Sequence, residues 1–188
     1  MSRSFAQLDS AAADVINILR GIREYSDARI AFKDVDFIIN ISSAPTGVKQ
    51  RLLALPNTPF VQHAQYFYYE TPEGIQIQID VTPEFQSPYM PAAATKLQDI
   101  PVGGVPYISP TDLMVFKIFS CGLRAQAVKK RTDAADAEQV LTMMTEHSSL
   151  KLTSAQRAIV EPCIADMVAH GSKDDKWWRE QLGLPVKK

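Results

Sequence analysis

The sequence predicts an α+β fold, in which a small mixed β-sheet has helices packed on one side and is followed by a helical C-terminal region. Two segments, residues 33–41 and 75–81, alternate apolar and polar side chains with the two-residue period of a strand. Residues 8–23 instead carry apolar side chains at helical spacing. The segments after residue 108 are all helical in pattern, so we expect an α/β core at 1–108 and a helical region at 109–188.

Composition restricts the class of protein. A chain of 188 residues suits one domain with a helical appendage, and its net charge of −1 offers no global attraction to nucleic acid. Cys121 and Cys163 are too few for a disulfide framework or a zinc site. We find no run that resembles a signal peptide or a membrane span. These features predict a cytoplasmic protein without a membrane partner.

The N-terminal elements follow from periodicity. Residues 8–23 predict an amphipathic helix, with Asp9 and Ser10 as its start signals. Residues 28–32 predict the beginning of a strand that runs into residues 33–41, because no turn residue separates them. The sequence therefore predicts one long strand here.

A hairpin is expected in the middle of the chain. A short helix at 48–55 ends at prolines, and an aromatic strand at 65–70 is joined to the strand 75–81 by the turn 71–74. Aromatic residues in strands are usually core residues, so we favour burial over base stacking.

The C-terminal half is predicted to be helical. Residues 82–104 indicate a loop with a short helix, and residues 105–108 a last strand. Ser109 and Pro110 are typical of a helix start, and that helix ends near Gly122. Further helices are expected at residues 133–147, 153–169 and 174–182.

Three carboxylates mark the polar sides of the two predicted strands. Asp34 and Asp36 share one side of the first strand, and Asp80 lies on the polar side of the second. If the strands are neighbours, the three acids repel one another unless a cation lies among them, and Mg²⁺ or Mn²⁺ suits such oxygen ligands. The alternative is an exposed Asp-x-Asp pair that binds nothing.

One basic cluster stands out in the helical region. It consists of Arg124, Lys129, Lys130 and Arg131. Such a cluster either contacts phosphate or a polynucleotide, or forms a solvated loop between helices.

The order of these motifs resembles the nucleotidyltransferase superfamily related to DNA polymerase β, in the branch of AbiEii-type toxins and minimal nucleotidyltransferases. The resemblance covers about residues 28–145. Its motifs are Asp34-Val35-Asp36-Phe37, the later Asp80, Lys117 on a helix, Arg124, and Asp133-Ala134-Ala135-Asp136.

The resemblance implies a reaction and a set of residue roles. A nucleoside monophosphate would pass from a nucleoside triphosphate to a hydroxyl of RNA or protein, with Mg²⁺ or Mn²⁺ as cofactor. Asp34, Asp36 and Asp80 would bind the ions, and Asp80 would also help to deprotonate the acceptor. The cations Lys117, Arg124, Lys129, Lys130 and Arg131 would contact phosphate.

One family feature is missing. The family holds the triphosphate on a Gly-Gly or Gly-Ser turn at a helix start, before the Asp-x-Asp strand. Residues 28–33 leave no room for it, so the chain reads as truncated at residues 32–33. A gene-model or splicing deletion, a degenerate paralogue and a different nucleotide site remain open. We expect an impaired or inactive enzyme; the alternatives are a non-catalytic interaction or regulatory domain and a nucleic-acid binder.

Overall fold

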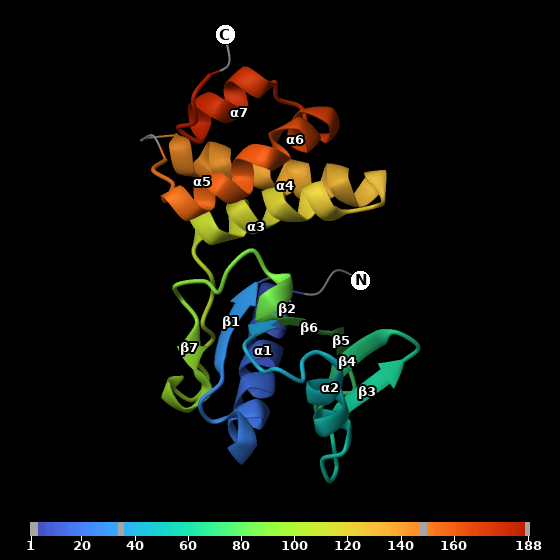
Figure 1. Ribbon diagram of the computed structural model, residues 1–188. Coiled ribbons are helices and arrows are strands. Elements are labelled where there is room, and N and C mark those ends of the chain that lie inside the picture. The colour runs from blue at the N-terminus through green and yellow to red at the C-terminus, as the bar shows by residue number, and fades with distance from the viewer. Residues whose placement is uncertain (1–3, 34–35, 147–149, 187–188) are drawn as a thin grey trace. The chain divides into compact units, whose positions relative to one another are not determined.

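The computed structural model describes residues 4–33, 36–146 and 150–186. The chain divides into two compact units, Met1–Ile108 and Ser109–Lys188, and each is described by itself. Helices occur in both units, and the described strands form one sheet of four strands and one of three (Figure 1). This confirms the predicted α+β fold class.

The first helix, α1 (Phe5–Arg20), begins earlier than predicted. The Ser4 side chain accepts a hydrogen bond from the backbone N–H of Gln7, and the Gln7 side chain accepts one from the backbone N–H of Ser4. This reciprocal capping box, rather than Asp9 and Ser10, starts the helix. The buried face of α1 joins the core of the first unit through Ala11, Ala12, Val15, Ile16 and Leu19.

The four-stranded sheet has the order β6-β2-β1-β7. Its strands are β1 (Arg29–Lys33), β2 (Asp36–Ile39), β6 (Asp80–Pro83) and β7 (Thr95–Lys96). β1 is antiparallel to both β2 and β7, whereas β2 and β6 are parallel. The sheet is therefore mixed, as expected, although β7 lies in a segment predicted to be a loop.

The prediction of one strand through residues 28–41 is wrong. Lys33 pairs directly with Asp36 across antiparallel strands, so the chain reverses direction between them. Asp34 and Val35 lie outside the described residues. The reversal brings Phe32 and Phe37 together, with ring centroids 5.0 Å apart in the core. This packing favours a hairpin over an extended strand, because both strands then bury the same face.

The three-stranded sheet is antiparallel and contains β3 (Phe60–His63), β4 (Tyr66–Glu70) and β5 (Gln76–Gln78). It confirms the predicted hairpin. The strand predicted at 75–81 is divided, however, because β5 and β6 belong to different sheets. Ile79 lies at the division, and its N–H donates to the Phe67 carbonyl at 2.9 Å. The chain thus crosses from one sheet to the other one residue before Asp80.

Short elements complete the first unit: α2 (Thr46–Leu53) and three 3-10 turns, η1 (Arg23–Tyr25), η2 (Glu84–Gln86) and η3 (Leu97–Asp99). The strand predicted at 105–108 is wrong, because only an isolated bridge joins Phe32 to Tyr107. Pro106 has no N–H to donate to a ladder, and its carbonyl accepts from Phe32 at 2.9 Å.

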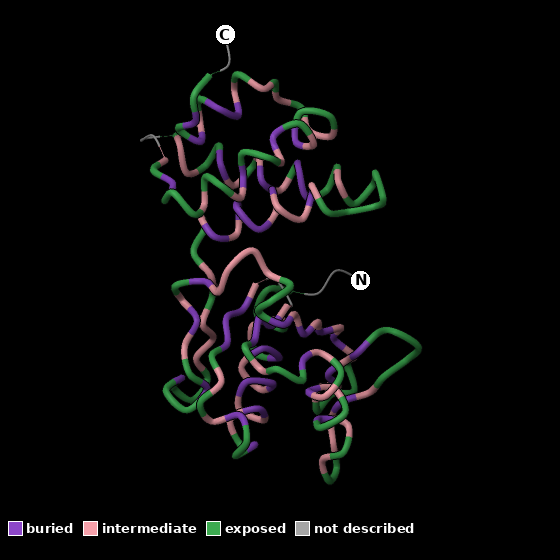
Figure 2. The backbone as a smooth tube through the Cα atoms, in the orientation of Figure 1, coloured by how far each residue is buried: buried purple, intermediate pink, exposed green. Residues whose placement is uncertain are grey.

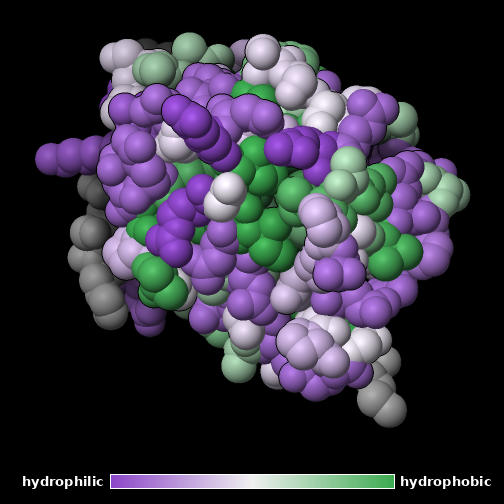
Figure 3. All heavy atoms as spheres, turned by 90° about the horizontal axis from the view of Figure 1, so that it is seen from below, coloured by the Kyte–Doolittle hydropathy of each residue, from purple (hydrophilic) through white to green (hydrophobic). Residues whose placement is uncertain are grey.

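Aromatic side chains of β3 and β4 form part of the core of the first unit. Phe60 and Phe67 stack with centroids 5.4 Å apart, and Tyr69 is 5% exposed. Phe67 and Tyr69 of the predicted aromatic strand are core residues, as predicted, whereas Tyr66 of the same strand is 45% exposed. Buried backbone runs along β1 and β2 (Figure 2). Figure 3 shows hydrophobic side chains reaching the surface in places, bordered by hydrophilic ones.

The second unit is helical. It contains α3 (Pro110–Leu123), α4 (Ala127–Thr145), α5 (Ser154–Val160), η4 (Glu161–Cys163), α6 (Ile164–His170) and α7 (Asp175–Gln181). Ser109 caps α3 as predicted, accepting from the Asp112 N–H at 3.0 Å. The helix predicted at 153–169 is interrupted by η4, where Pro162 cannot supply a helical N–H. None of the helices in the described part of the chain has the length and hydrophobicity to span a membrane.

Candidate metal centre

Asp36 and Asp80 begin two neighbouring parallel strands and lie opposite each other in the register. Phe37 and Val81, the next residues of these strands, belong to the core. Because side chains alternate along a strand, Asp36 and Asp80 share the other face of the sheet. Neighbouring strands lie about 4.8 Å apart, so the two carboxylates are within reach of one ion.

Lys33 extends this row of charges onto a third strand. It pairs with Asp36 across β1 and β2, and its Nζ lies 4.0 Å from Asp36 Oδ2. The Lys33 side chain is 13% exposed and that of Asp36 is 30% exposed. On the other side of the row, Gln78 Nε2 donates to Asp80 Oδ2 at 3.5 Å. The row therefore reads Lys33, Asp36, Asp80 across three strands.

The row of charges lies next to buried apolar side chains on the same face of the sheet. The preceding position on the same face of β1 is Ala31, which pairs with Ile38 of β2. Ala31 and Ile38 are 0% and 2% exposed. The sequence placed Ile38 on the polar face of its strand, and it lies on that face but is buried. Charges beside such a patch interact more strongly than charges in open water.

The described residues supply two of the three predicted metal ligands. Asp34 lies outside them, and among them no cluster of three His, Cys, Asp or Glu side chains is present. Asp36 and Asp80 are half-buried and bear hard oxygen donors, which fit Mg²⁺ or Mn²⁺. These two donors are of the kind that suits a divalent ion, and the role of all three aspartates stays a prediction.

The predicted phosphate-binding cations lie in the helical unit. Lys117 Nζ is 2.8 Å from Asp136 Oδ2, and Arg124 Nε is 3.0 Å from Asp133 Oδ2. Lys130 forms an ion pair with Asp166. Each of these three cations therefore has a carboxylate partner in its own unit.

The basic run from Lys129 to Arg131 lies within α4. The interpretation of this run as an inter-helix loop is therefore wrong. The helix predicted to start at residue 133 begins earlier, at Ala127. Lys129 and Arg131 are exposed on the surface of α4. Their contact with phosphate remains a prediction.

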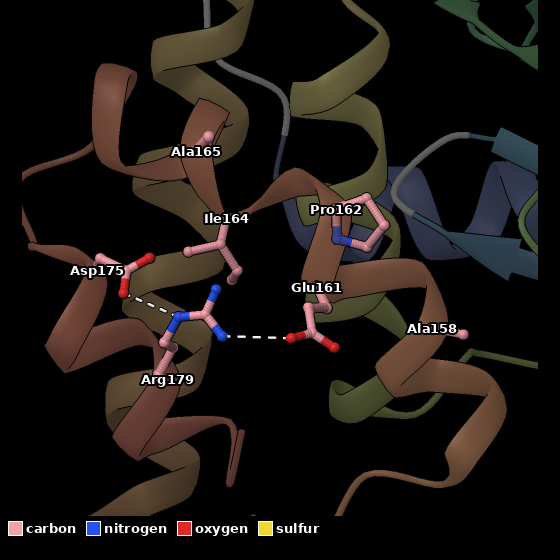
Figure 4. A pocket seen from close by; sticks show the side chains of 7 residues that line it. All are labelled: Ala158, Glu161, Pro162, Ile164, Ala165, Asp175 and Arg179. Atoms are coloured by element: carbon pink, nitrogen blue, oxygen red, sulfur yellow. Dashed lines mark hydrogen bonds and ion pairs between the residues drawn. The ribbon is translucent and has the colours of Figure 1, made fainter. Parts of the chain in front are cut away.

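The helical unit also contains a buried arginine. Arg179 of α7 is 2% exposed and lines a pocket with Glu161, Pro162 and Ile164 (Figure 4). Its Nε is 2.8 Å from Asp175 Oδ2, and its Nη1 is 3.3 Å from Glu161 Oε1 and 3.0 Å from the Pro185 carbonyl oxygen. These contacts tie α7 to η4 and to the chain that follows, so we assign Arg179 a structural role.

Sequence reasoning missed Lys33 as part of the site. Lys33 is adjacent to Asp34 in the chain, but its opposition to Asp36 depends on the reversal between them. The available signal was a lysine directly before Asp-x-Asp. It indicates a contact between Lys33 and Asp36 only if β1 and β2 are antiparallel neighbours.

Comparisons with known proteins give one informative likeness. No family model and no curated protein matches the chain. Among solved structures, the chain is similar to an antigenic nucleotidyltransferase-like protein from Paracoccidioides brasiliensis. The TM-score is 0.55 with 18% sequence identity, over 88% of this chain and 89% of that chain. This likeness shows the fold: the chain has a nucleotidyltransferase-like fold, in agreement with the resemblance found in its sequence.

Proposed function

We propose that the protein is a metal-dependent nucleotidyltransferase-like protein of the AbiEii-like branch, cytoplasmic, with impaired binding of nucleoside triphosphate. The observation that supports this most is the register of β2 and β6, which pairs Asp36 with Asp80. Two carboxylates on adjacent strands of this fold form a partial ligand set for Mg²⁺ or Mn²⁺.

Where turnover occurs, the reaction is transfer of a nucleoside monophosphate from a triphosphate to a hydroxyl of RNA or protein. The bound ions would neutralise the charge that develops on the phosphoryl group. Asp34, Asp36 and Asp80 would supply the oxygen ligands of the ions, and Asp80 would also help to take the proton of the acceptor hydroxyl. Lys117, Arg124, Lys129, Lys130 and Arg131 would contact phosphate and balance its charge.

The impairment rests on the chain just before β2. Between α1 and β2, the described residues form one 3-10 turn, η1, and the strand β1. The chain then reverses between Lys33 and Asp36. The described part of this segment thus lacks a helix N-terminus whose backbone N–H groups would bind a triphosphate.

The second candidate is a non-catalytic interaction or regulatory domain that keeps the fold. It is favoured by the ion pairs of Lys117, Arg124 and Lys130 with carboxylates of their own unit. The positive charges of these three side chains neutralise carboxylates of the helical unit, so their presence is explained without a bound phosphate.

Pyrophosphate release separates the two candidates. Each of the four nucleoside triphosphates is incubated with the protein and Mg²⁺ or Mn²⁺, and Asp80→Asn is compared with Asp27→Asn. Asp27 is a matched control in the same unit, since its side chain is 79% exposed and pairs with Lys96. Release that disappears only in Asp80→Asn supports the transferase, whereas no release from any triphosphate favours the non-catalytic domain.

A further inference from the structure

We propose that Lys33 is a built-in counter-cation of the carboxylate site, which competes with divalent metal for Asp36 and so weakens metal binding by the Asp36 and Asp80 pair. The proposal rests on the proposed function in one respect, the assignment of these carboxylates as metal ligands. It adds a residue that sets the metal affinity of this chain.

The hairpin between β1 and β2 creates the arrangement. Directly opposed residues of antiparallel strands have neighbouring side chains on one face. The register places Lys33 opposite Asp36 and Asp36 opposite Asp80, so the ammonium group lies beside Asp36, and Asp80 lies one strand further along the same row. Phe32 and Phe37, the neighbouring pair, contact each other on the core side, which fixes the alternation.

The burial of Lys33 keeps its charge near the site. Its side chain is 13% exposed, and its Nζ lies 4.0 Å from Asp36 Oδ2. A lysine on an open surface moves its ammonium group away from an arriving cation at little cost, whereas a largely enclosed one does not. Lys33 therefore repels a divalent ion and at the same time replaces part of its charge.

Substitution of Lys33 tests the proposal through metal binding, without reference to turnover. Lys33→Met keeps most of the length of the side chain and removes its charge, while Lys33→Arg keeps the charge. Mn²⁺ is titrated into wild type and each variant, and binding is followed by calorimetry. We expect Lys33→Met to bind Mn²⁺ on the order of tenfold or more tightly than wild type, since a nearby positive charge is removed. Lys33→Arg should behave as wild type.

A double variant locates the gained affinity. In Lys33→Met/Asp80→Asn the gain should vanish, whereas in Lys33→Met/Asp27→Asn it should persist. If Lys33→Met does not fold, as judged by a cooperative thermal transition, Lys33→Gln takes its place. Equal Mn²⁺ affinity of wild type and the neutral variants, or binding by none of them, overturns the proposal.

The metal-binding results for Lys33 can be distinguished from the result of the pyrophosphate-release experiment. Tighter binding by Lys33→Met together with no pyrophosphate release by wild type supports the role of Lys33 and rejects the transferase. Release by wild type with unchanged affinity in Lys33→Met rejects the role of Lys33 and keeps the transferase.

Discussion

Asp36 and Asp80, which are 44 positions apart in the chain, are the first residues of two parallel strands and face each other in the register. Ile79 lies between β5 and β6 and still bonds to the Phe67 carbonyl of β4, so the chain changes from one sheet to the other directly after it. The carboxylate pair is thus a consequence of one strand-to-strand crossing.

Arg124→Ala should destabilise the helical unit. The Asp133 side chain is 7% exposed and its carboxylate is 3.0 Å from Arg124 Nε, so loss of the guanidinium leaves a buried charge without this partner. We expect a cost of about 1–3 kcal/mol in the free energy of unfolding, measured by urea denaturation. Lys129→Ala, on the exposed surface of α4, should change stability by less than about 0.5 kcal/mol. Equal stability of the two variants would contradict a structural role for Arg124.

Phe67→Ala should destabilise the first unit strongly. Phe67 is 0% exposed and stacks on Phe60 with the ring planes 3° from parallel. Removal of a buried phenyl ring costs about 3–5 kcal/mol, through lost transfer energy and the cavity left behind. Tyr66→Ala, one residue away and 45% exposed, is the control. A similar denaturation midpoint for both variants would show that the core assigned to β4 is wrong.

Tyr69 should make stability depend on alkaline pH. Burial, followed by its hydrogen bond to Asp14 at 3.0 Å, raises the Tyr69 pKa from 10.0 to about 12. Since the folded pKa exceeds the unfolded one, the stabilisation is complete below pH 10 and is lost as pH rises through 12.

The variant Tyr69→Phe isolates this contribution. It should lose about 0.5–1.5 kcal/mol at neutral pH, and the difference from wild type should shrink between pH 10 and 12. Urea denaturation at a series of pH values measures the difference. A gap that stays constant up to pH 12 would contradict the assignment.

Cys121 should be inert toward thiol reagents in the folded protein. Burial, followed by the nearby Asp166, raises the Cys121 pKa to about 11, so the reactive thiolate is scarce at pH 8. We expect the half-buried Cys163 to react first with an aromatic disulfide reagent, although burial raises its pKa too. In Cys163→Ala, rapid reaction should appear only on unfolding. Rapid labelling of folded Cys163→Ala would show that Cys121 is accessible.

Periodicity and capping rules predicted those parts of the fold that depend on nearby residues. The start of α3 at Ser109 and the β4–β5 hairpin are local, and both were predicted. The reversal between Lys33 and Asp36 was missed, because no glycine or proline marks it. It is fixed by the packing of Phe32 against Phe37, a tertiary effect.

The candidate site was predicted in part for the same reason. Alternation placed Asp36 and Asp80 on polar strand faces, and the parallel register then brought them together. The contact of Lys33 with Asp36 depends on the missed hairpin, so it was invisible in the sequence. The ion pairs of Lys117 and Arg124 join residues 19 and 9 positions apart on separate helices, beyond the reach of helical periodicity.

The central claim is that the Asp36 and Asp80 carboxylates bind a divalent cation, and titration of Mn²⁺ followed by the electron paramagnetic resonance signal of the free ion tests it most directly. Wild type and Asp27→Asn should deplete free Mn²⁺ equally, and Asp80→Asn should not, while all three retain one thermal transition. Equal depletion by Asp80→Asn and wild type would contradict the claim, and so would no depletion by folded wild type and folded Lys33→Met.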